Sequence, residues 1–361
     1  MSNYKEGRAT INYSGKAFLN PKMSMLRDIS VLFLKALNQK DARLLDSTAA
    51  TGIRGIRYSL EAGARDVTFI DINKDACRSI RANVKKNKVK AKVIGQSIQE
   101  FSASGAGPFD IIDLDPFGSP VPHIHDLLKI SGGETTMMVT ATDTAVLCGA
   151  HYAACLKIYG ARPMHNELCK EAGIRILLGF IAREAAQFNF GIDVRLSISD
   201  LHYMRVFVTL KRGADLAVGS IKQMGFLASC RSCHGFQLYC GIIPEIVKKC
   251  PNCGAARELA GPMWLGPLCD RDLLSRMVRE RGYDDARRYI ESVQAEPDDP
   301  FFYSVPSLTR SAGTGSVSPK AVIDKLGKRG YRTSPTQFEK EAVKTSAPLS
   351  EVEKAVRSLA A

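Results

Sequence analysis

The residues best suited to chemistry in this 361-residue chain are Asp113-Leu114-Asp115-Pro116-Phe117-Gly118, which end an apolar, strand-like run. An aromatic amine has its lone pair delocalised into its ring. It becomes reactive when two acceptors bind both N–H groups and turn the lone pair outward, and the Asp115 carboxylate and Pro116 carbonyl can do this. If the amine belongs to a nucleic-acid base, Phe117 could stack on that base once it has been extracted from its RNA helix. The alternative is a structural turn built on Pro and Gly.

A second group of residues suits a nucleoside. The stretch from Asp46 to Gly55, with Gly52 inside it, lies where a first strand turns into a helix. Small residues there let the backbone approach a ligand, and the helix N-terminus offers free amides. The stretch lacks the Gly-x-Gly-x-x-Gly spacing of dinucleotide sites, which favours the methionine part of S-adenosylmethionine over a pyrophosphate. Asp71, at the end of the next strand, could accept both ribose hydroxyls or could cap a helix.

Four cysteines have the spacing of a zinc site. Two Cys-x2-Cys pairs are separated by sixteen residues, and Gly254 follows the second pair as in zinc knuckles. Four thiolates on two tight turns can bind one tetrahedral Zn, and because every ligand comes from the protein we expect a structural ion. The alternative is four unligated thiols. The expected ligands are Cys230, Cys233, Cys250 and Cys253.

The order of apolar runs predicts which elements position these residues. Strands expected at residues 43–46, 66–71, 109–115 and 135–141 alternate with helices at 55–62 and 74–87, the pattern of a parallel sheet covered by helices. A long helix at 168–187 and strands at 194–199 and 203–210 would complete an α/β fold. Ligands of such sheets bind at the carboxyl ends of the strands, where Asp71 and Asp115 lie. Asp143, after another strand, is a minor candidate or a turn residue.

The pattern changes near residue 213. We therefore expect two domains, an α/β domain at 1–212 and a smaller α+β domain at 213–361 that carries the zinc-ribbon-like insertion at 230–253. The net charge of +13 would attract a polyanion such as RNA. The sequence contains no apolar run of membrane-spanning length and no export signal, so we expect a cytoplasmic protein without an obligate protein partner.

The motifs together resemble one enzyme family. Asp115-Pro116-Phe117 is similar to the [Asn/Asp]-Pro-Pro-aromatic motif of amino methyltransferases, and the chain as a whole resembles the tRNA guanine N2,N2-dimethyltransferases that modify guanine 26. The stretches that carry this resemblance lie at 18–23, 27–28, 50–57, 113–120, 140–143, 147–150, 261–268 and 344–348.

This resemblance implies a class I S-adenosylmethionine methyltransferase, Rossmann-like in fold, whose C-terminal domain binds tRNA and which methylates one amine twice. Arg27, Arg54 and Asp71 would contact the cofactor, Asp115 would orient the guanine amine, and Phe18 and Phe117 would sandwich the base. Beside the adenine, where relatives often have acidic residues, this chain has Gln96-Ser97-Ile98. Ser97 and Ile98 would contact the adenine there through a hydroxyl or the backbone.

Two alternative functions fit the same residues. A methyltransferase of another exocyclic base amine, in RNA or DNA, could use the same acceptors. A non-catalytic RNA-binding protein could retain a nucleoside site beside a zinc ribbon, although such a protein would have no reason to keep both Asp71 and Asp115.

Overall fold

A seven-stranded sheet forms the centre of the molecule. The computed structural model describes residues 2–13, 17–39, 41–200 and 202–360, and its main sheet has the order β5-β4-β3-β6-β7-β9-β8. The first five of these strands run parallel. At one edge, β9 pairs antiparallel with β7 on one side and with β8 on the other. The strands are β3 (Arg43–Asp46), β4 (Asp66–Ile70), β5 (Ala91–Ile94), β6 (Phe109–Leu114), β7 (Ser131–Ala141), β8 (Phe190–Asp200) and β9 (Tyr203–Arg212).

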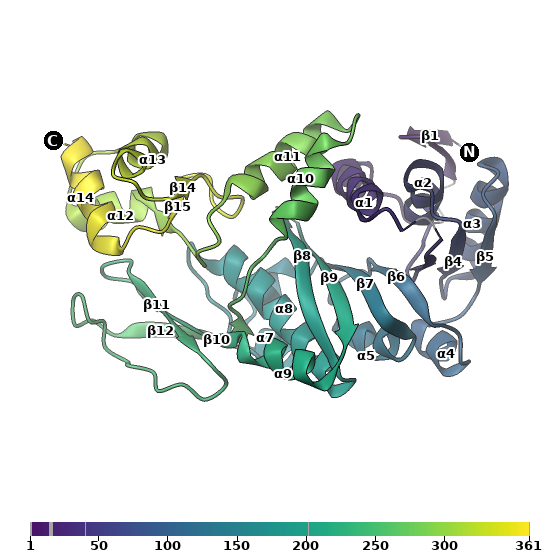
Figure 1. The fold of residues 1–361 in the computed structure, drawn as a ribbon, viewed down its shortest axis with the longest axis horizontal. Helices are drawn as coiled ribbons and strands as arrows, with labels where there is room; N and C mark the ends of the chain where they lie inside the picture. The colour runs from purple at the N-terminus through teal and green to yellow at the C-terminus, as the bar shows by residue number, and fades with distance from the viewer. Residues whose placement is uncertain (1, 14–16, 40, 201, 361) are drawn as a thin grey trace.

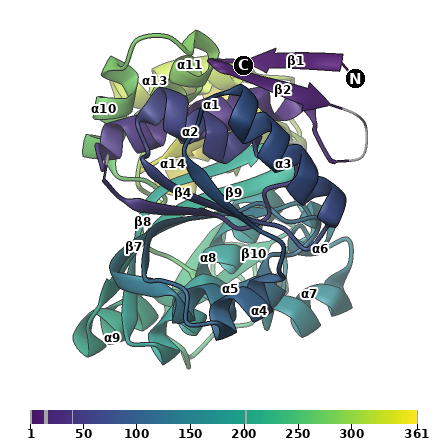
Figure 2. The same cartoon turned by 90° about the vertical axis from the view of Figure 1, so that its right-hand side faces the viewer.

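Helices cover both faces of this sheet, as Figure 2 shows. One face carries α1 (Ser24–Leu37), α2 (Ile53–Ala62) and α3 (Lys74–Lys86). The other carries α4 (Ile98–Ala103), α5 (Val121–Lys129), α7 (Tyr152–Tyr159) and α8 (Cys169–Gln187), with the short α6 (Thr144–Leu147) between strand β7 and α7. The arrangement confirms the predicted α/β class I methyltransferase fold, and the expected strands and helices are present. The sequence reading did not identify β5 or the N-terminal hairpin of β1 (Ser2–Glu6) and β2 (Ala9–Tyr13).

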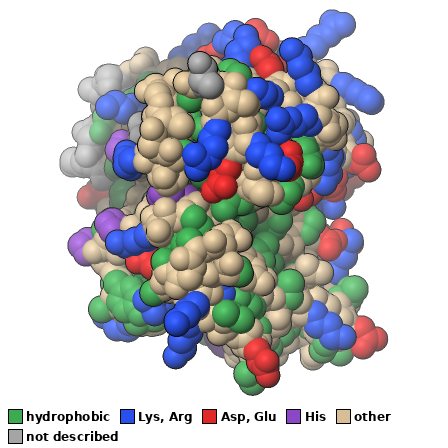
Figure 3. All heavy atoms as spheres, turned by 90° about the vertical axis from the view of Figure 1, so that its left-hand side faces the viewer, with side chains coloured by type: hydrophobic (Ala, Val, Ile, Leu, Met, Phe, Trp, Pro, Cys, Tyr) green, Lys and Arg blue, Asp and Glu red, His purple; other side chains and the backbone are tan. Residues whose placement is uncertain are grey.

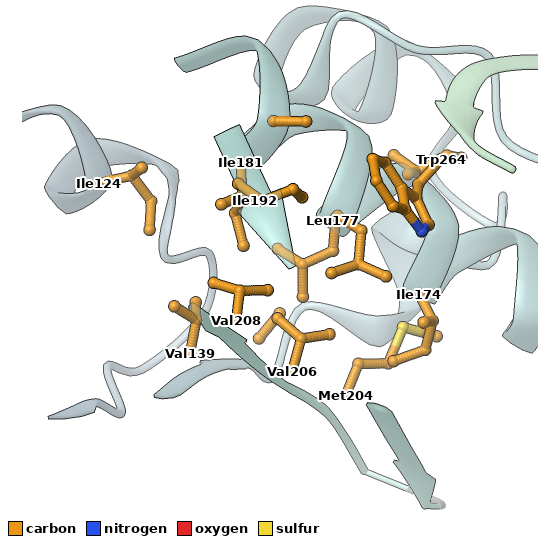
Figure 4. Close-up of a cluster of buried hydrophobic side chains, with 14 of the residues drawn as sticks. Ile124, Val139, Ile174, Leu177, Ile181, Ile192, Met204, Val206, Val208 and Trp264 are labelled. Carbon is orange, nitrogen blue, oxygen red and sulfur yellow. The ribbon is translucent and has the colours of Figure 1, made fainter. Parts of the chain in front are cut away.

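Apolar packing holds α8 against the sheet. Leu177 and Ile181 of α8 point towards Val206 and Val208 of β9, and Trp264 closes the cluster from a later strand (Figure 4). These side chains are at most 4% exposed. On the opposite face, α2 lies unusually close to the sheet because residue 55 is glycine: a Cβ there would be 2.4 Å from the ring of Phe69.

The chain continues beyond residue 213 without leaving this core. Helix α9 (Ala214–Lys222) packs on β8 and α8, and a three-stranded sheet follows in the order β11-β10-β12. Its strands are β10 (Met224–Cys230), β11 (Phe236–Cys240) and β12 (Arg257–Trp264). Helices α10 (Arg271–Arg279) and α11 (Asp284–Ala295) return to pack on α1, so the two sides of residue 213 share hydrophobic clusters.

The last 60 or so residues form a unit with its own small core, drawn in yellow-green at the left of Figure 1. Its elements are β13 (Tyr303–Ser304), α12 (Val305–Ala312), α13 (Pro319–Lys328), β14 (Thr333–Ser334), β15 (Ala342–Thr345) and α14 (Leu349–Ala360); the remaining element of the chain is the short 3-10 helix at Pro21–Met23. Among the described residues, no helix combines the length and apolar character needed to cross a membrane.

Buried charges join this terminal unit to α8. The Lys344 ammonium lies 3.3 Å from Glu171 and 3.2 Å from Glu296, and Arg175 binds the same Glu171 at 2.7 Å. Burial alone would raise the pKa of Glu171, but Lys344 and Arg175 hold it below its ordinary value. Arg175 also donates to the carbonyls of Trp264 and Gly266. Two of the stretches that carry the family resemblance, 261–268 and 344–348, thus fix the terminal unit relative to the sheet.

Candidate active site and metal centre

Three of the predicted site segments meet at the carboxyl edge of the sheet. The Thr48 hydroxyl accepts the backbone N–H of Asp115 at 2.9 Å, which ties the turn after β3 to the end of β6. The backbone N–H of Ala50 donates to the Asp71 carboxylate at 2.9 Å, which ties the same turn to the end of β4. Gly52 adopts a positive φ of 77° at the start of α2, a conformation that glycine tolerates best. The turn, Asp71 and Asp115 therefore line one edge, as the strand pattern predicts.

Arg54 and Asp115 form an ion pair inside this edge. The guanidinium donates to one Asp115 oxygen through Nε at 2.8 Å and through Nη2 at 2.5 Å. Burial tends to raise the pKa of Asp115, but Arg54 and Arg205 hold it below its ordinary value. Asp115 is thus ionised at neutral pH and able to accept hydrogen bonds.

Two buried donors at this edge have no partner within the described residues: Arg54 Nη1 and the Thr51 hydroxyl. A buried polar group without a partner is costly, and at the ligand-binding edge of a sheet such an atom is available to a polar ligand. An anionic, hydrogen-bonding group such as the amino-acid end of S-adenosylmethionine would satisfy both. The residues present therefore fit this cofactor.

Phe18 and Phe117 come together from distant parts of the sequence. Their ring centroids are 4.7 Å apart in an edge-to-face contact, and the rings are 50% and 75% exposed. Exposed aromatic pairs at a ligand edge are suited to stacking on a base. A base held between them would need room for a stacked contact on each of its faces, which a centroid separation of 4.7 Å does not provide, so the rings must separate to admit it.

The turn that carries Phe117 is pinned to the neighbouring strand. Thr142 binds both backbone groups of Gly118. The Thr142 hydroxyl accepts the Gly118 N–H at 2.7 Å, and the Thr142 N–H donates to the Gly118 carbonyl at 3.0 Å. One residue further on, Asp143 accepts the Tyr159 hydroxyl at 2.9 Å. Tyr159 in turn accepts the Ser119 hydroxyl at 2.9 Å, so Asp143 braces the turn through Tyr159 and Ser119.

The residues predicted to contact the ribose and the adenine are partly engaged in local structure. Asn73, not Asp71, caps α3, and Asp71 accepts the Asn73 N–H at 2.8 Å while keeping lone pairs for other donors. Ser97 forms a reciprocal capping box with Glu100 at the start of α4, so its hydroxyl and backbone N–H already have partners. Ile98 follows at the first helical position, where the backbone N–H has no carbonyl one turn earlier. The contact to adenine would therefore come from the Ile98 backbone more readily than from the Ser97 hydroxyl.

Arg27 lies in a buried network with the N-terminal hairpin. It binds Glu6 through two hydrogen bonds, at 2.7 and 2.5 Å, and is 3% exposed. Burial would raise the pKa of Glu6, but Arg27 and its neighbours lower it to about 2. Arg57 binds Glu6, Asp28 and Glu61 in the same network. In this structure Arg27 thus holds the first hairpin against α1, and a contact with the cofactor would have to be added to that role.

Sequence reasoning missed the charges beneath Asp115. Asp113 is 1% exposed and accepts hydrogen bonds from Arg205 and Tyr58, while Asp46 faces it from the neighbouring strand. Burial and the nearby Asp113 charge raise the pKa of Asp46 to about 8. The signal was present, since Asp46 ends buried strand β3 and Asp113 is the last residue but one of buried strand β6, but the Arg205 partner lies on a distant antiparallel strand.

A pH effect on stability follows from Asp46. Its folded pKa of about 8 lies above the unfolded value of about 3.9, so the folded chain binds more protons between these two values. Stability is therefore highest at the acid end of this window and falls as the pH rises through the folded pKa. We therefore expect the thermal stability of the wild type to fall more between about pH 6 and about pH 9 than the thermal stability of Asp46→Asn does. Parallel curves for the two proteins would contradict the raised pKa.

The four predicted zinc ligands form one cluster at the tip of the three-stranded β11-β10-β12 sheet, called the smaller sheet below. Their sulfur atoms all lie within 4.8 Å of one another, with Cys230–Cys253 and Cys233–Cys250 at 3.5 Å. Tetrahedral Zn–S bonds of 2.3 Å place sulfur atoms about 3.8 Å apart, so the cluster fits zinc. Each pair sits on the same kind of turn: the first cysteine's N–H donates five residues ahead, to Gly235 or Ala255. His234 binds Glu167 at 3.0 Å and lies outside the sulfur cluster.

Comparison with known proteins gives a consistent result. Residues 2–357 match the family model described as N2,N2-dimethylguanosine tRNA methyltransferase. The chain is 36% identical to a tRNA (guanine(26)-N(2))-dimethyltransferase of Thermococcus kodakarensis, over 96% of this chain and 94% of that protein. It is 33% identical to the enzyme so named from Methanobrevibacter smithii, over 97% and 93%. The solved structure of Trm1 from Pyrococcus horikoshii with S-adenosyl-L-methionine superposes with a TM-score of 0.91 at 34% identity, over 98% of this chain and 99% of that one.

Proposed function

Since this chain belongs to the N2,N2-dimethylguanosine tRNA methyltransferase family, we propose that it transfers two methyl groups in succession from S-adenosylmethionine to the N2 amine of guanine 26 in tRNA. The main support is the family match along the whole chain, with Asp115, Pro116 and Phe117 at the cofactor edge of the sheet. The cytoplasm is the proposed location.

The cofactor would lie along the turn after β3. When bound, it supplies a methyl group activated by a positive sulfonium. Arg54 Nη1 and the Thr51 hydroxyl would bind its amino-acid end, because both are buried donors without a partner in the described structure. Asp71 would accept the ribose hydroxyls, and Gly52 would let the backbone approach closely. Arg27, Ser97 and Ile98 complete the proposed contacts, with Ile98 acting through its backbone.

Asp115 and the Pro116 carbonyl would each accept one N–H of the guanine amine, leaving its lone pair directed at the methyl group. The amine nitrogen would bond to the methyl carbon as the carbon–sulfur bond breaks, with that electron pair left on sulfur, and the positively charged amine would then lose a proton. Asp115 is ionised and adjacent, so it can take that proton. After the first transfer one N–H remains; once Asp115 has released its proton to solvent and the spent cofactor has been exchanged, the same carboxylate can orient that N–H for the second.

Phe18 and Phe117 would stack on the extruded base. We expect Phe117→Ala to weaken tRNA binding by about 1–3 kcal/mol, because a stacking partner is lost. The affinity for S-adenosylmethionine should stay unchanged, and Phe117→Trp should restore capture of the base. Binding constants for tRNA and cofactor, measured separately, check this. Unchanged tRNA binding in Phe117→Ala would remove the stacking role.

Residues 213–361 would provide much of the tRNA-binding surface. Figure 3 shows Lys and Arg side chains gathered in the upper half of the face at the C-terminal end of the molecule. The exposed basic residues of the terminal unit include Arg310, Lys320, Lys328, Lys340 and Arg357. Such cations bind phosphates and make the affinity depend on salt.

The experiment that tests this function uses unmodified tRNA transcript, purified protein and labelled S-adenosylmethionine, followed by digestion to nucleosides and mass spectrometry. We expect N2-methylguanosine early and N2,N2-dimethylguanosine later. A methylated adenosine, or methylation of DNA, would instead favour the rival function on another exocyclic amine. Cofactor binding without any methylated nucleoside would point to a non-catalytic RNA-binding protein.

A further inference from the structure

A buried arginine connects the strands beneath the catalytic edge. Arg205 of β9 is fully buried and lies directly opposite Thr140 of β7. Its guanidinium donates to the Thr140 hydroxyl at 2.6 Å and to the two oxygens of Asp113 at 2.9 and 3.0 Å. The Arg205 Nε has no partner among the described residues, but the three hydrogen bonds of the two Nη atoms leave this buried guanidinium little freedom to move, so Arg205 fixes the orientation of Thr140.

Thr140 is the neighbour of Asp115 in the sheet. Leu114 pairs with Val139 in the parallel register of β6 and β7, so the next step places Thr140 beside Asp115. A hydroxyl has one hydrogen to donate. Because the Thr140 oxygen accepts from Arg205, its hydroxyl hydrogen is available to the neighbouring Asp115 carboxylate.

On the premise of the function proposed above, we propose that Arg205 and Thr140 are positioning residues for the methyl transfer: Arg205 fixes the Thr140 hydroxyl, which holds the Asp115 carboxylate in the orientation that accepts the guanine amine. Arg54 binds Asp115 as well, but it lies on the cofactor side and has an unpartnered Nη1. Thr140 would therefore hold Asp115 in place when Arg54 also binds the cofactor.

The charge of Asp115 depends on the same surroundings. The titratable and charged groups around it are Arg54 and Tyr58 of α2, Asp46 of β3, Asp113 of β6, and Tyr203 and Arg205 of β9. Burial opposes the ionised form of Asp115, whereas the two arginines and the neighbouring Thr140 hydroxyl favour it. Loss of the Thr140 donor should therefore raise the pKa of Asp115 and move the acid limb of turnover to higher pH.

The test compares Thr140→Val, Thr140→Ser and Thr136→Val. Valine removes the hydroxyl at nearly constant volume, serine keeps it, and Thr136 is a matched control, buried on the same strand with Thr209 as its partner at 3.4 Å. We expect Thr140→Val to lower kcat about ten- to a hundredfold, the effect of losing a hydrogen bond to a charged group, with an unchanged Kd for S-adenosylmethionine. Thr140→Ser should stay close to wild type, as should Thr136→Val.

A titration of the Asp115 carboxyl by carbon NMR, assigned by comparison with Asp115→Asn, needs no turnover. It therefore separates failure of the positioning role from failure of the proposed function. A higher pKa of Asp115 in Thr140→Val, but not in Thr140→Ser, supports the positioning role. Equal kcat, pH profile and Asp115 titration in Thr140→Val and Thr136→Val would overturn it. A wild-type enzyme that yields no methylated guanine would contradict the proposed function instead.

Discussion

Asp115→Ala is expected to lower turnover at least a hundredfold, because misplacement of a reacting group costs about that much, while the Kd for S-adenosylmethionine changes only a few fold. The alanine variant lacks the acceptor that orients the amine. The Arg54 guanidinium, which binds Asp115 at 2.5 Å, would be released towards the cofactor, so cofactor affinity has no reason to fall. Single-turnover rates and equilibrium cofactor binding measure the two quantities separately.

The control for this variant is Asp115→Asn, which retains the shape of the side chain and the fold around Arg54. Its amide oxygen would accept from the Arg54 guanidinium, so the NH2 group, a donor, is left towards the guanine amine, and the amide cannot take up a proton. We expect its turnover to lie much nearer to alanine than to wild type. Equal losses of turnover and of cofactor affinity in both variants would assign Asp115 to cofactor binding instead.

Removal of zinc is expected to unfold the tip of the smaller sheet. Structural zinc contributes about 10–16 kcal/mol in isolated zinc-finger peptides, and the Cys230 to Cys253 segment contains few buried apolar side chains of its own. The inner ends of β10 and β12 should persist, because Leu227, Met263 and Trp264 belong to the main core. We therefore expect Cys250→Ser to lose zinc and to let trypsin cut after Lys248 and Lys249, which are already exposed but lie in backbone that the folded tip holds in place, while cofactor binding remains.

Cys240→Ser provides the matched control for the zinc variant. Cys240 lies on β11 between the two cysteine pairs, is exposed and is outside the sulfur cluster. Its serine variant should hold one zinc per chain and resist trypsin as the wild type does. Full zinc content in Cys250→Ser, or identical proteolysis of the two variants, would exclude the four-cysteine site.

The sequence was sufficient for six of the seven strands of the main sheet and for the positions of Asp71 and Asp115, because buried parallel strands appear as apolar runs and their carboxyl ends share one edge; the partly exposed edge strand β5 was not identified. It was also sufficient for the zinc cluster, whose ligand spacing is a local property. Asn73, rather than Asp71, proved to cap α3, since its side chain reaches the free amides of the first turn. Which side chain caps a helix depends on the exact residue at which the helix begins, and a pattern of apolar residues does not determine that residue.

Side chains that meet across long separations could not be predicted from the pattern. The pairing of Arg205 with Asp113 depends on the antiparallel register of β7 and β9, and a buried arginine within an apolar strand gives no sign of its partner. Likewise, the resemblance assigned Arg27 to the cofactor, whereas its bond to Glu6 required knowledge of the N-terminal hairpin. The division into two domains at residue 213 remains a prediction, while the hydrophobic clusters continue across it.

The most direct test of tRNA guanine 26 as the substrate uses two transcripts that differ only at position 26, one with guanine and the other with adenine. Each is incubated to completion with the protein and labelled S-adenosylmethionine, and the methyl groups incorporated per tRNA are counted. The proposed function predicts two methyl groups in the guanine transcript and none in the adenine transcript. Equal incorporation into both transcripts, or none into either, would contradict it.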